Sequence, residues 1–186
     1  MNKLLIIASS AALAAYALPA LATPVGDVTG QVNVSGQVTA KCSNLGSASV
    51  DLDVGELADG NGVVVTDFAQ NKHAEFTVAC TGAAPKVTIT AAPLTGPASP
   101  PPGYTNLVQY KATATVADAN GGHVAPYVLS NGSNPLNSNV AILAAAIATG
   151  TGNVKVDLSN PTAVSGSRLI AGNYTGTVTV TVAPTS

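Results

Sequence analysis

The sequence has 186 residues, of which 9% are charged and 4% are aromatic, and its formal net charge at pH 7 is −2. This balance excludes the basic surface by which nucleic-acid-binding and membrane-surface proteins are recognised, so no nucleic-acid partner is expected. Alanine, valine and threonine are the most abundant residue types. Because β-branched side chains favour strands, the composition predicts an all-β protein.

Residues 1–22 have the three parts of a secretory signal peptide. Lys3 makes the start basic, Leu4–Leu18 is an apolar run, and Ala20–Ala22 is a small-x-small cleavage site. The mature chain is therefore expected to begin at Thr23, which leaves about 164 residues, enough for one domain with its own core. No second apolar run is long enough for a membrane span, so no membrane insertion is expected after cleavage.

The stretch that follows alternates strictly. From Val28 to Cys42 every even position is apolar or glycine, and every odd position except Lys41 is a small polar residue. This period of two predicts a β-strand with one buried face over Val28–Ala40. A typical strand has about five or six residues. The excess length means that the chain either bends at its glycines or keeps part of the strand available to pair elsewhere.

The chain has two cysteines, Cys42 and Cys80, both in the predicted exported part. In an oxidising compartment the default interpretation is one disulfide between them. A metal pair and a reactive thiol are the competing interpretations, although neither cysteine has another Cys or a His at ligand spacing.

Further alternating runs predict short strands separated by turn clusters. These strands are Ser49–Val54, Ala74–Cys80, Lys86–Ala92, Val108–Ala117, Pro126–Ser130, Asn153–Leu158 and Asn173–Ala183. Pro93–Gly103, with five prolines, is expected to be a loop, and Asn139–Thr149 is compatible with either a helix or a buried strand. Seven to nine short strands of this kind predict a β-sandwich.

Side chains that carry chemistry are few. His73 and His123 lie in polar stretches, and no nucleophile elbow, zinc-protease motif or phosphate-binding loop occurs. The carboxylates from Asp51 to Asp59 lack the spacing of a calcium loop and are interpreted as solvated. We therefore expect no enzyme activity, no catalytic residue, no metal and no cofactor.

Four segments together resemble the subunits of chaperone–usher pili, in the archaic pilin and spore-coat-protein-U-like branch. They are Val32–Ser43 with the first cysteine, Val50–Gly55, Phe76–Gly82 with the second cysteine, and Leu169–Val182, which is similar to the closing motif of that branch. The resemblance covers the first third of the chain and its end, and the middle by composition alone. The chain departs from most of these subunits because it ends Ala-Pro-Thr-Ser without a penultimate aromatic residue.

The resemblance implies an immunoglobulin-like β-sandwich that lacks one strand, over residues 37–186, behind an N-terminal extension at 23–36. The extension would supply a donor strand to a neighbouring subunit by β-strand addition. Its implied donor residues are Val28, Gly30, Val32 and Val34. The implied acceptor groove is lined by the last strand, through Tyr174, Val178, Val180 and Val182.

The implied function is that of a structural subunit of a surface fimbria, serving adhesion or biofilm formation. Its implied partners are identical or related pilin subunits, a periplasmic chaperone and an outer-membrane usher, and its route is export through the periplasm to the cell surface. The alternative is a self-complemented, monomeric secreted or periplasmic β-sandwich. A carbohydrate-binding sandwich is a third hypothesis, which the absence of tryptophan and the scattered tyrosines disfavour.

Overall fold

The computed structural model describes residues 33–96, 99–163 and 167–185. These residues contain thirteen strands and no helix, and so no helix long and apolar enough to cross a membrane. The strands are β1 (Cys42–Asn44), β2 (His73–Phe76), β3 (Val78–Cys80), β4 (Lys86–Ala91), β5 (Leu94–Thr95), β6 (Tyr104–Thr105), β7 (Leu107–Ala117), β8 (His123–Val124), β9 (Tyr127–Leu129), β10 (Val140–Ile142), β11 (Val154–Ala163), β12 (Arg168–Leu169) and β13 (Val178–Ala183). The predicted signal peptide at 1–22 lies outside the described residues.

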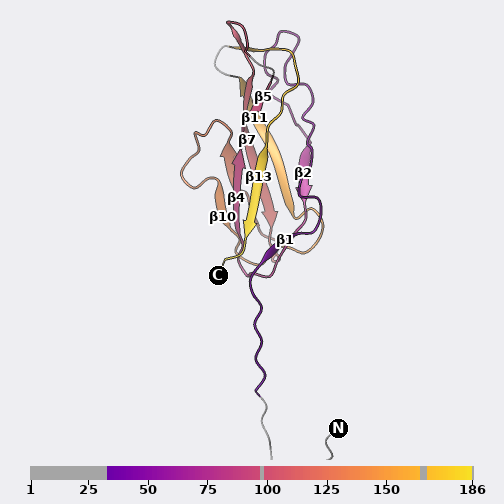
Figure 1. Cartoon of the computed structure of the whole chain (residues 1–186), viewed down its shortest axis with the longest axis vertical. Coiled ribbons are helices and arrows are strands. Elements are labelled where there is room, and N and C mark those ends of the chain that lie inside the picture. The colour runs from indigo at the N-terminus through magenta and orange to yellow at the C-terminus, as the bar shows by residue number, and fades with distance from the viewer. Residues whose placement is uncertain (1–32, 97–98, 164–166, 186) are drawn as a thin grey trace, which may run out of the picture. The chain divides into compact units, whose positions relative to one another are not determined.

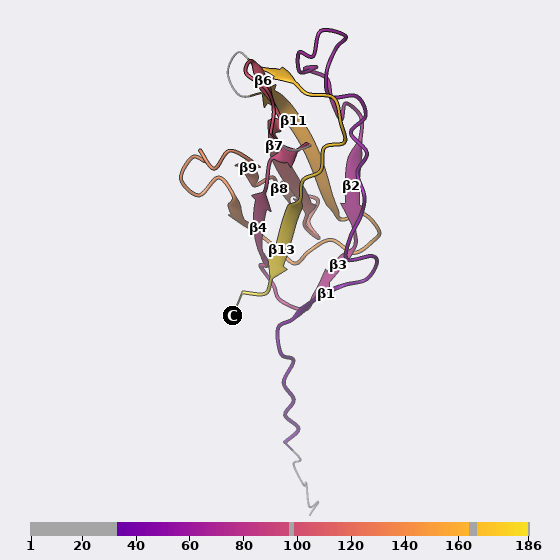
Figure 2. The ribbon, with the colours of Figure 1, turned by 45° about the horizontal axis from the view of Figure 1, so that its top comes forward.

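Two sheets form the layers of the fold (Figures 1 and 2). The smaller sheet has the antiparallel order β10-β4-β13. The larger one is built around β7, which pairs with β11 along one edge and with β5, β9 and β8 along the other, while β2 lies outside β11. Two short pairs, β1–β3 and β6–β12, complete the structure. The predicted all-β sandwich is confirmed.

The core is made by the inward faces of β4 and β7. Val87 and Ile89 of β4 are fully buried, and so are Ala112, Ala114 and Val116 of β7. Complete burial of a valine or isoleucine side chain stabilises a fold by roughly 1.5–3 kcal/mol. The predicted strands over Lys86–Ala92 and Val108–Ala117, and their inward faces, are confirmed, and these two strands anchor the two sheets to each other.

The predicted strand at Val28–Ala40 is wrong over its described part. Residues 33–41 belong to no strand, and pairing begins at Cys42. The predicted strand at Ser49–Val54 is also wrong, because no described strand pairs with that segment. In both segments the alternating pattern is present, but a neighbouring strand to complete a ladder is missing from the described residues.

Other boundaries also differ from the prediction: β11 continues to Ala163, beyond the predicted end at Leu158, and β5 lies within the predicted loop Pro93–Gly103. The run Ala74–Cys80 is divided at Thr77, because β2 pairs with β11 and β3 pairs with β1. The strand predicted from Asn173 begins only at Val178, since residues 173–177 make a single bridge, from Thr175 to Thr95. The ambiguous segment at 139–149 holds the short strand β10 and two buried side chains, Leu143 and Ile147.

Candidate functional site

β13 forms one wall of the candidate site, and the described residues pair with only one of its edges. Its valines, Val178, Val180 and Val182, are half-buried, and the threonines between them are exposed. The Ala92 amide donates to the Thr177 carbonyl at the edge shared with β4, at 2.9 Å. Because backbone groups of successive residues in a strand point to opposite edges, those of the three valines point away from β4. No described strand lies along that second edge.

The opposite wall is the extended segment of residues 48–59. Leu52 and Val54 are half-buried while Asp51 and Asp53 are exposed, so the side chains alternate as in a strand over residues 51–54. Apart from the isolated bridge between Ala58 and Val64, the segment has no recorded strand pairing. It presents apolar side chains inward, and its backbone is bonded in part to the chain that follows: the amides of Val65 and Ala69 donate to the carbonyls of Leu57 and Val54.

Between these walls runs one groove, composed of two adjoining hollows of about 960 and about 630 Å³. The hollows share their lining at Val50, Asp51, Phe76, Gly176 and Val178. The floor is apolar and comes mainly from the larger sheet, through Ala74, Phe76, Val78, Tyr110, Val154, Val156 and Leu158. The sandwich is thus open along the side between β13 and residues 48–59.

Tyr174 holds the end of the groove that is remote from the disulfide. Its hydroxyl donates to the Ile170 carbonyl at 2.8 Å and lies 3.3 Å from the Thr105 carbonyl oxygen. Partial burial raises the pKa of the Tyr174 phenol. The ring lies against Gly96, where an added Cβ would come within 2.6 Å of a ring atom. These contacts fix residues 170–176 to the chain that precedes β7. Residues 170–176 therefore line the groove without being part of the strand β13.

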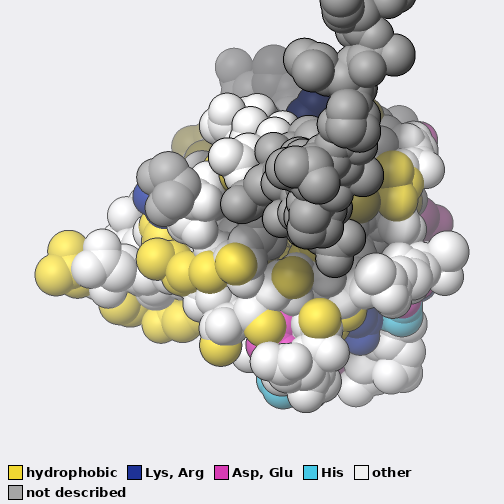
Figure 3. Space-filling view, turned by 90° about the horizontal axis from the view of Figure 1, so that it is seen from below, with side chains coloured by type: hydrophobic (Ala, Val, Ile, Leu, Met, Phe, Trp, Pro, Cys, Tyr) yellow, Lys and Arg dark blue, Asp and Glu magenta, His cyan; other side chains and the backbone are white. Residues whose placement is uncertain are grey.

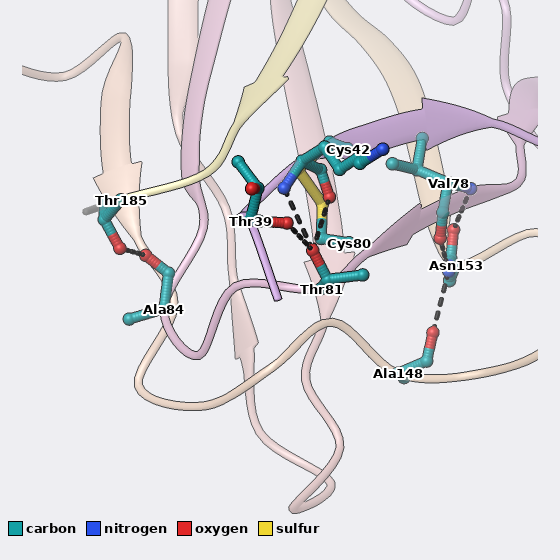
Figure 4. The surroundings of a disulfide bond; sticks show 10 residues. Thr39, Cys42, Val78, Cys80, Thr81, Ala84, Ala148, Asn153 and Thr185 are labelled. Atoms are coloured by element: carbon teal, nitrogen blue, oxygen red, sulfur yellow. Dashed lines mark hydrogen bonds between the residues drawn. A yellow bond between two sulfur atoms is a disulfide. The ribbon is translucent and has the colours of Figure 1, made fainter. Parts of the chain in front are cut away.

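The disulfide closes the other end, which we call the base (Figure 4). Cys42 and Cys80 are directly paired residues of β1 and β3, and their bond confirms the predicted disulfide. Thr81 fixes the chain that leads into β1: its hydroxyl donates to the Thr39 carbonyl at 3.1 Å and accepts from the Lys41 amide at 3.0 Å. Cys42 itself lines the groove, so the disulfide positions the base end of the wall.

Asn153 ties β3 to the larger sheet (Figure 4). Its side-chain oxygen accepts from the Val78 amide at 2.9 Å, and its nitrogen donates to the carbonyls of Val78 at 2.7 Å and Ala148 at 2.8 Å. The side chain therefore takes the place of a strand neighbour for Val78. This role could not be predicted from the sequence, since the partners are 75 positions apart.

All four predicted acceptor residues line the groove: Tyr174, Val178, Val180 and Val182. Of the predicted donor residues, Val28, Gly30 and Val32 lie outside the described residues. Val34 is 91% exposed and belongs to no strand, and Val38 is 82% exposed. Sequence analysis did not assign residues 48–59 to the groove, although their alternation marked an inward apolar face.

On the face drawn in Figure 3, charged side chains are few among the described residues. Within the described ranges, no group of three or more His, Cys, Asp or Glu side chains could hold a metal ion. The features that could act on a ligand are the apolar floor and the edge of β13 along which no described strand lies. Comparisons with protein-family models, with curated proteins and with solved structures found no match.

Proposed function

We propose that this protein is a structural subunit of a surface fimbria that polymerises by donor-strand exchange, and that it acts in adhesion or biofilm formation without enzymatic activity. The observation that carries the proposal is the apolar groove beside the unpaired edge of β13. An edge of this kind pairs readily with an added strand, whose main chain supplies hydrogen bonds and whose alternate side chains fill the floor.

The N-terminal extension of a second copy is the proposed occupant. Its alternating part, Val28–Val34, has seven residues and would span about 23 Å as a strand, against about 20 Å for the six residues of β13. Each valine fully buried on the floor would contribute roughly 1.5–3 kcal/mol before the cost of ordering the strand. Val34 and Val38, which are exposed, have apolar surface available for such a contact.

The two ends of the groove support a head-to-tail arrangement. An added Cβ on Gly82 would meet Pro184 at 3.5 Å and Ala40 at 3.8 Å, so the chain entering β1 and the chain leaving β13 share the base end. Tyr174 lies at the other end. A donor that leaves one copy at its base can enter the next copy at the Tyr174 end and run antiparallel to β13. Such a contact does not close on itself and builds a filament.

Until a donor arrives, the open groove is an aggregation hazard. We therefore propose that a periplasmic chaperone covers it and that an outer-membrane usher brings related subunits together. Because both steps lie between the inner membrane and the cell surface, they agree with the predicted signal peptide.

The test is polymerisation of the purified mature chain. The wild type is expected to give rods in the electron microscope and ladders on an unheated SDS gel, and Val28→Asp with Val32→Asp is expected to remove both. Val63→Asp is the matched control, since Val63 is 53% exposed and lines neither hollow. Unchanged ladders in the double variant would contradict the proposal. A sharp monomer peak that added donor peptide leaves unchanged would instead support the self-complemented sandwich.

A further inference from the structure

The groove has an acidic wall. Four of the nine acidic residues of the chain line it: Asp51, Asp53, Glu56 and Asp59. Among the described residues, no lysine or arginine lines either hollow. The groove is therefore much more negative than the chain as a whole, whose net charge is −2.

Three of these carboxylates lack an ion-pair partner. The ion pairs recorded in the described part of the chain are His73–Glu75 and Lys155–Asp157, which belong to β2 and β11. Backbone amides donate to two of the four carboxylates. The Gly55 amide donates to Asp53 at 2.9 Å, and the amides of Val63 and Asn61 donate to Asp59 and lower its pKa, with a further contribution from Arg168. Asp51, Asp53 and Glu56 form no ion pair within the described residues, and a nearby cation is Lys72, whose Nζ lies 3.3 Å from where an added Cβ on Gly55 would stand.

The orientation of Asp51 and Asp53 determines what these charges can contact. Both point away from the floor, since Leu52 and Val54 alternate with them and are half-buried. A strand in the groove would place every second side chain on the floor and the others outward, at about 4.8 Å from its neighbours. Its outward side chains would thus lie beside Asp51 and Asp53 on one side and beside the exposed threonines of β13 on the other.

Cross-strand pairs of opposite charge stabilise a sheet, and like charges directly opposite destabilise it. In the extension of this chain, the polar positions that alternate with the proposed donor residues are uncharged: Thr29, Gln31, Asn33 and Ser35. From Val28 to Ser35 the extension of a second copy is therefore neutral toward the acidic wall and does not use it, and its acidic residue, Asp27, precedes this stretch.

We propose that Asp51 and Asp53, assisted by Glu56, are specificity-determining residues of the groove, which prefers an extended strand with lysine or arginine at its outward positions and rejects one with acidic residues there. This inference rests on the proposed function, since it concerns the class of strand that the groove accepts. The apolar floor fixes which side chains point outward, because a slip by one residue would turn the polar face inward.

Three peptides test the proposal against the full mature chain. One has the uncharged sequence of residues 28–36, one carries Gln31→Lys and Asn33→Lys, and one carries Gln31→Glu and Asn33→Glu. Binding is measured by fluorescence anisotropy at low and high salt. At low salt the lysine peptide is expected to bind about three- to tenfold more tightly than the neutral one, and the glutamate peptide more weakly by a similar factor. High salt should reduce both differences.

A matched pair of variants distinguishes an effect of the wall carboxylates from an effect of the net charge of the protein. Asp51→Asn with Asp53→Asn is expected to abolish the preference, and Glu75→Gln with Asp157→Asn, which changes the net charge equally on β2 and β11, is expected to leave it intact. Equal binding of all three peptides at low salt would overturn the inference and leave the proposed function standing. An equal loss in both variants would also overturn it. Failure of every peptide to bind would contradict the proposed function itself.

Discussion

β4 and β13 are neighbours with almost the same sequence pattern and very different surroundings. Both have six residues in which apolar side chains alternate with threonine, and Val87 of β4 pairs directly with Val182 of β13. Val87 is fully buried, whereas Val182 is half-buried. β4 has a strand on each side, and β13 has a described strand only on one. Alternation thus identifies which face turns inward, but the number of neighbouring strands determines how far that face is buried.

The disulfide should give the largest effect, because it fixes the groove side of the sandwich. Replacing both Cys42 and Cys80 by serine is expected to lower the free energy of unfolding by about 4 kcal/mol on the chain-entropy estimate. Urea denaturation measures this change. Wild type treated with a reducing agent should show the same loss, and a variant as stable as the oxidised wild type would contradict the expectation.

The cross-strand pair itself supplies the most direct comparison. Val87→Ala removes a fully buried side chain and should cost about 2–3 kcal/mol, while Val182→Ala should cost about 1 kcal/mol. Urea denaturation of the monomer measures both losses in the free energy of unfolding. If a donor peptide occupies the groove, the cost of Val182→Ala should increase and that of Val87→Ala should not. Equal costs in the monomer would show that the open edge leaves Val182 as well packed as Val87.

Tyr110 of β7 is hydrogen-bonded to Ala92, which follows β4 and is in turn bonded to the residue before β13. Its hydroxyl donates to the Ala92 carbonyl at 2.6 Å, and the Ala92 amide donates to Thr177 just before β13. Burial raises the pKa of Tyr110 to about 12, above the ordinary value of 10.0. The folded state therefore keeps its proton longer than the unfolded state, so this contribution is complete below pH 10 and is lost as the pH rises toward 12.

We expect a decrease of about 1–2 kcal/mol in the free energy of unfolding across that pH range. Denaturation at several pH values measures the decrease. Tyr110→Phe should be less stable at neutral pH and should lack this part of the pH dependence. The matched control is Tyr104→Phe, since Tyr104 is 43% exposed. A pH profile identical in Tyr110→Phe and wild type would contradict the assignment.

The smallest effect is an alternation of hydrogen exchange along β13. The amides of Thr179 and Thr181 face β4 and should exchange slowly, and those of Val178, Val180 and Val182 face the open edge and should exchange faster. In β4, with neighbours on both edges, no such alternation is expected. Adding the donor peptide should slow the three valine amides, which NMR can follow residue by residue. Uniform protection of β13 without peptide would mean that its second edge is already paired.

The strands with partners on both edges were predictable from the sequence. β4 and β7 alternate, and their inward residues are the buried ones. Residues 33–40 and 49–54 alternate equally well and form no strand, because a ladder depends on a neighbour that the local sequence does not specify. The start of β13 was missed for a different reason: Tyr174 packs on Gly96, and Gly176 fits tightly against Pro93 and Leu94, contacts made between distant parts of the chain.

One of the two walls of the groove could be predicted from the sequence. Its β13 wall followed from the alternating valines and from the resemblance to pilus subunits. The opposite wall, and the concentration of carboxylates on it, required the structure, because only the fold places residues 48–59 across from β13. The hydrogen bonds between Asn153 and Val78 also required the structure, because the local sequence around Asn153 does not indicate which distant backbone groups its side chain contacts.

The position of Tyr110 and Tyr174 in the groove gives the protein a built-in optical reporter. The chain has five tyrosines and no tryptophan, so its near-ultraviolet fluorescence comes from tyrosine alone. Two of the five line the groove. A strand carrying a single tryptophan would accept excitation energy from these rings as it enters, and its emission would rise while theirs falls. Occupation of the groove can thus be followed in real time on unlabelled protein.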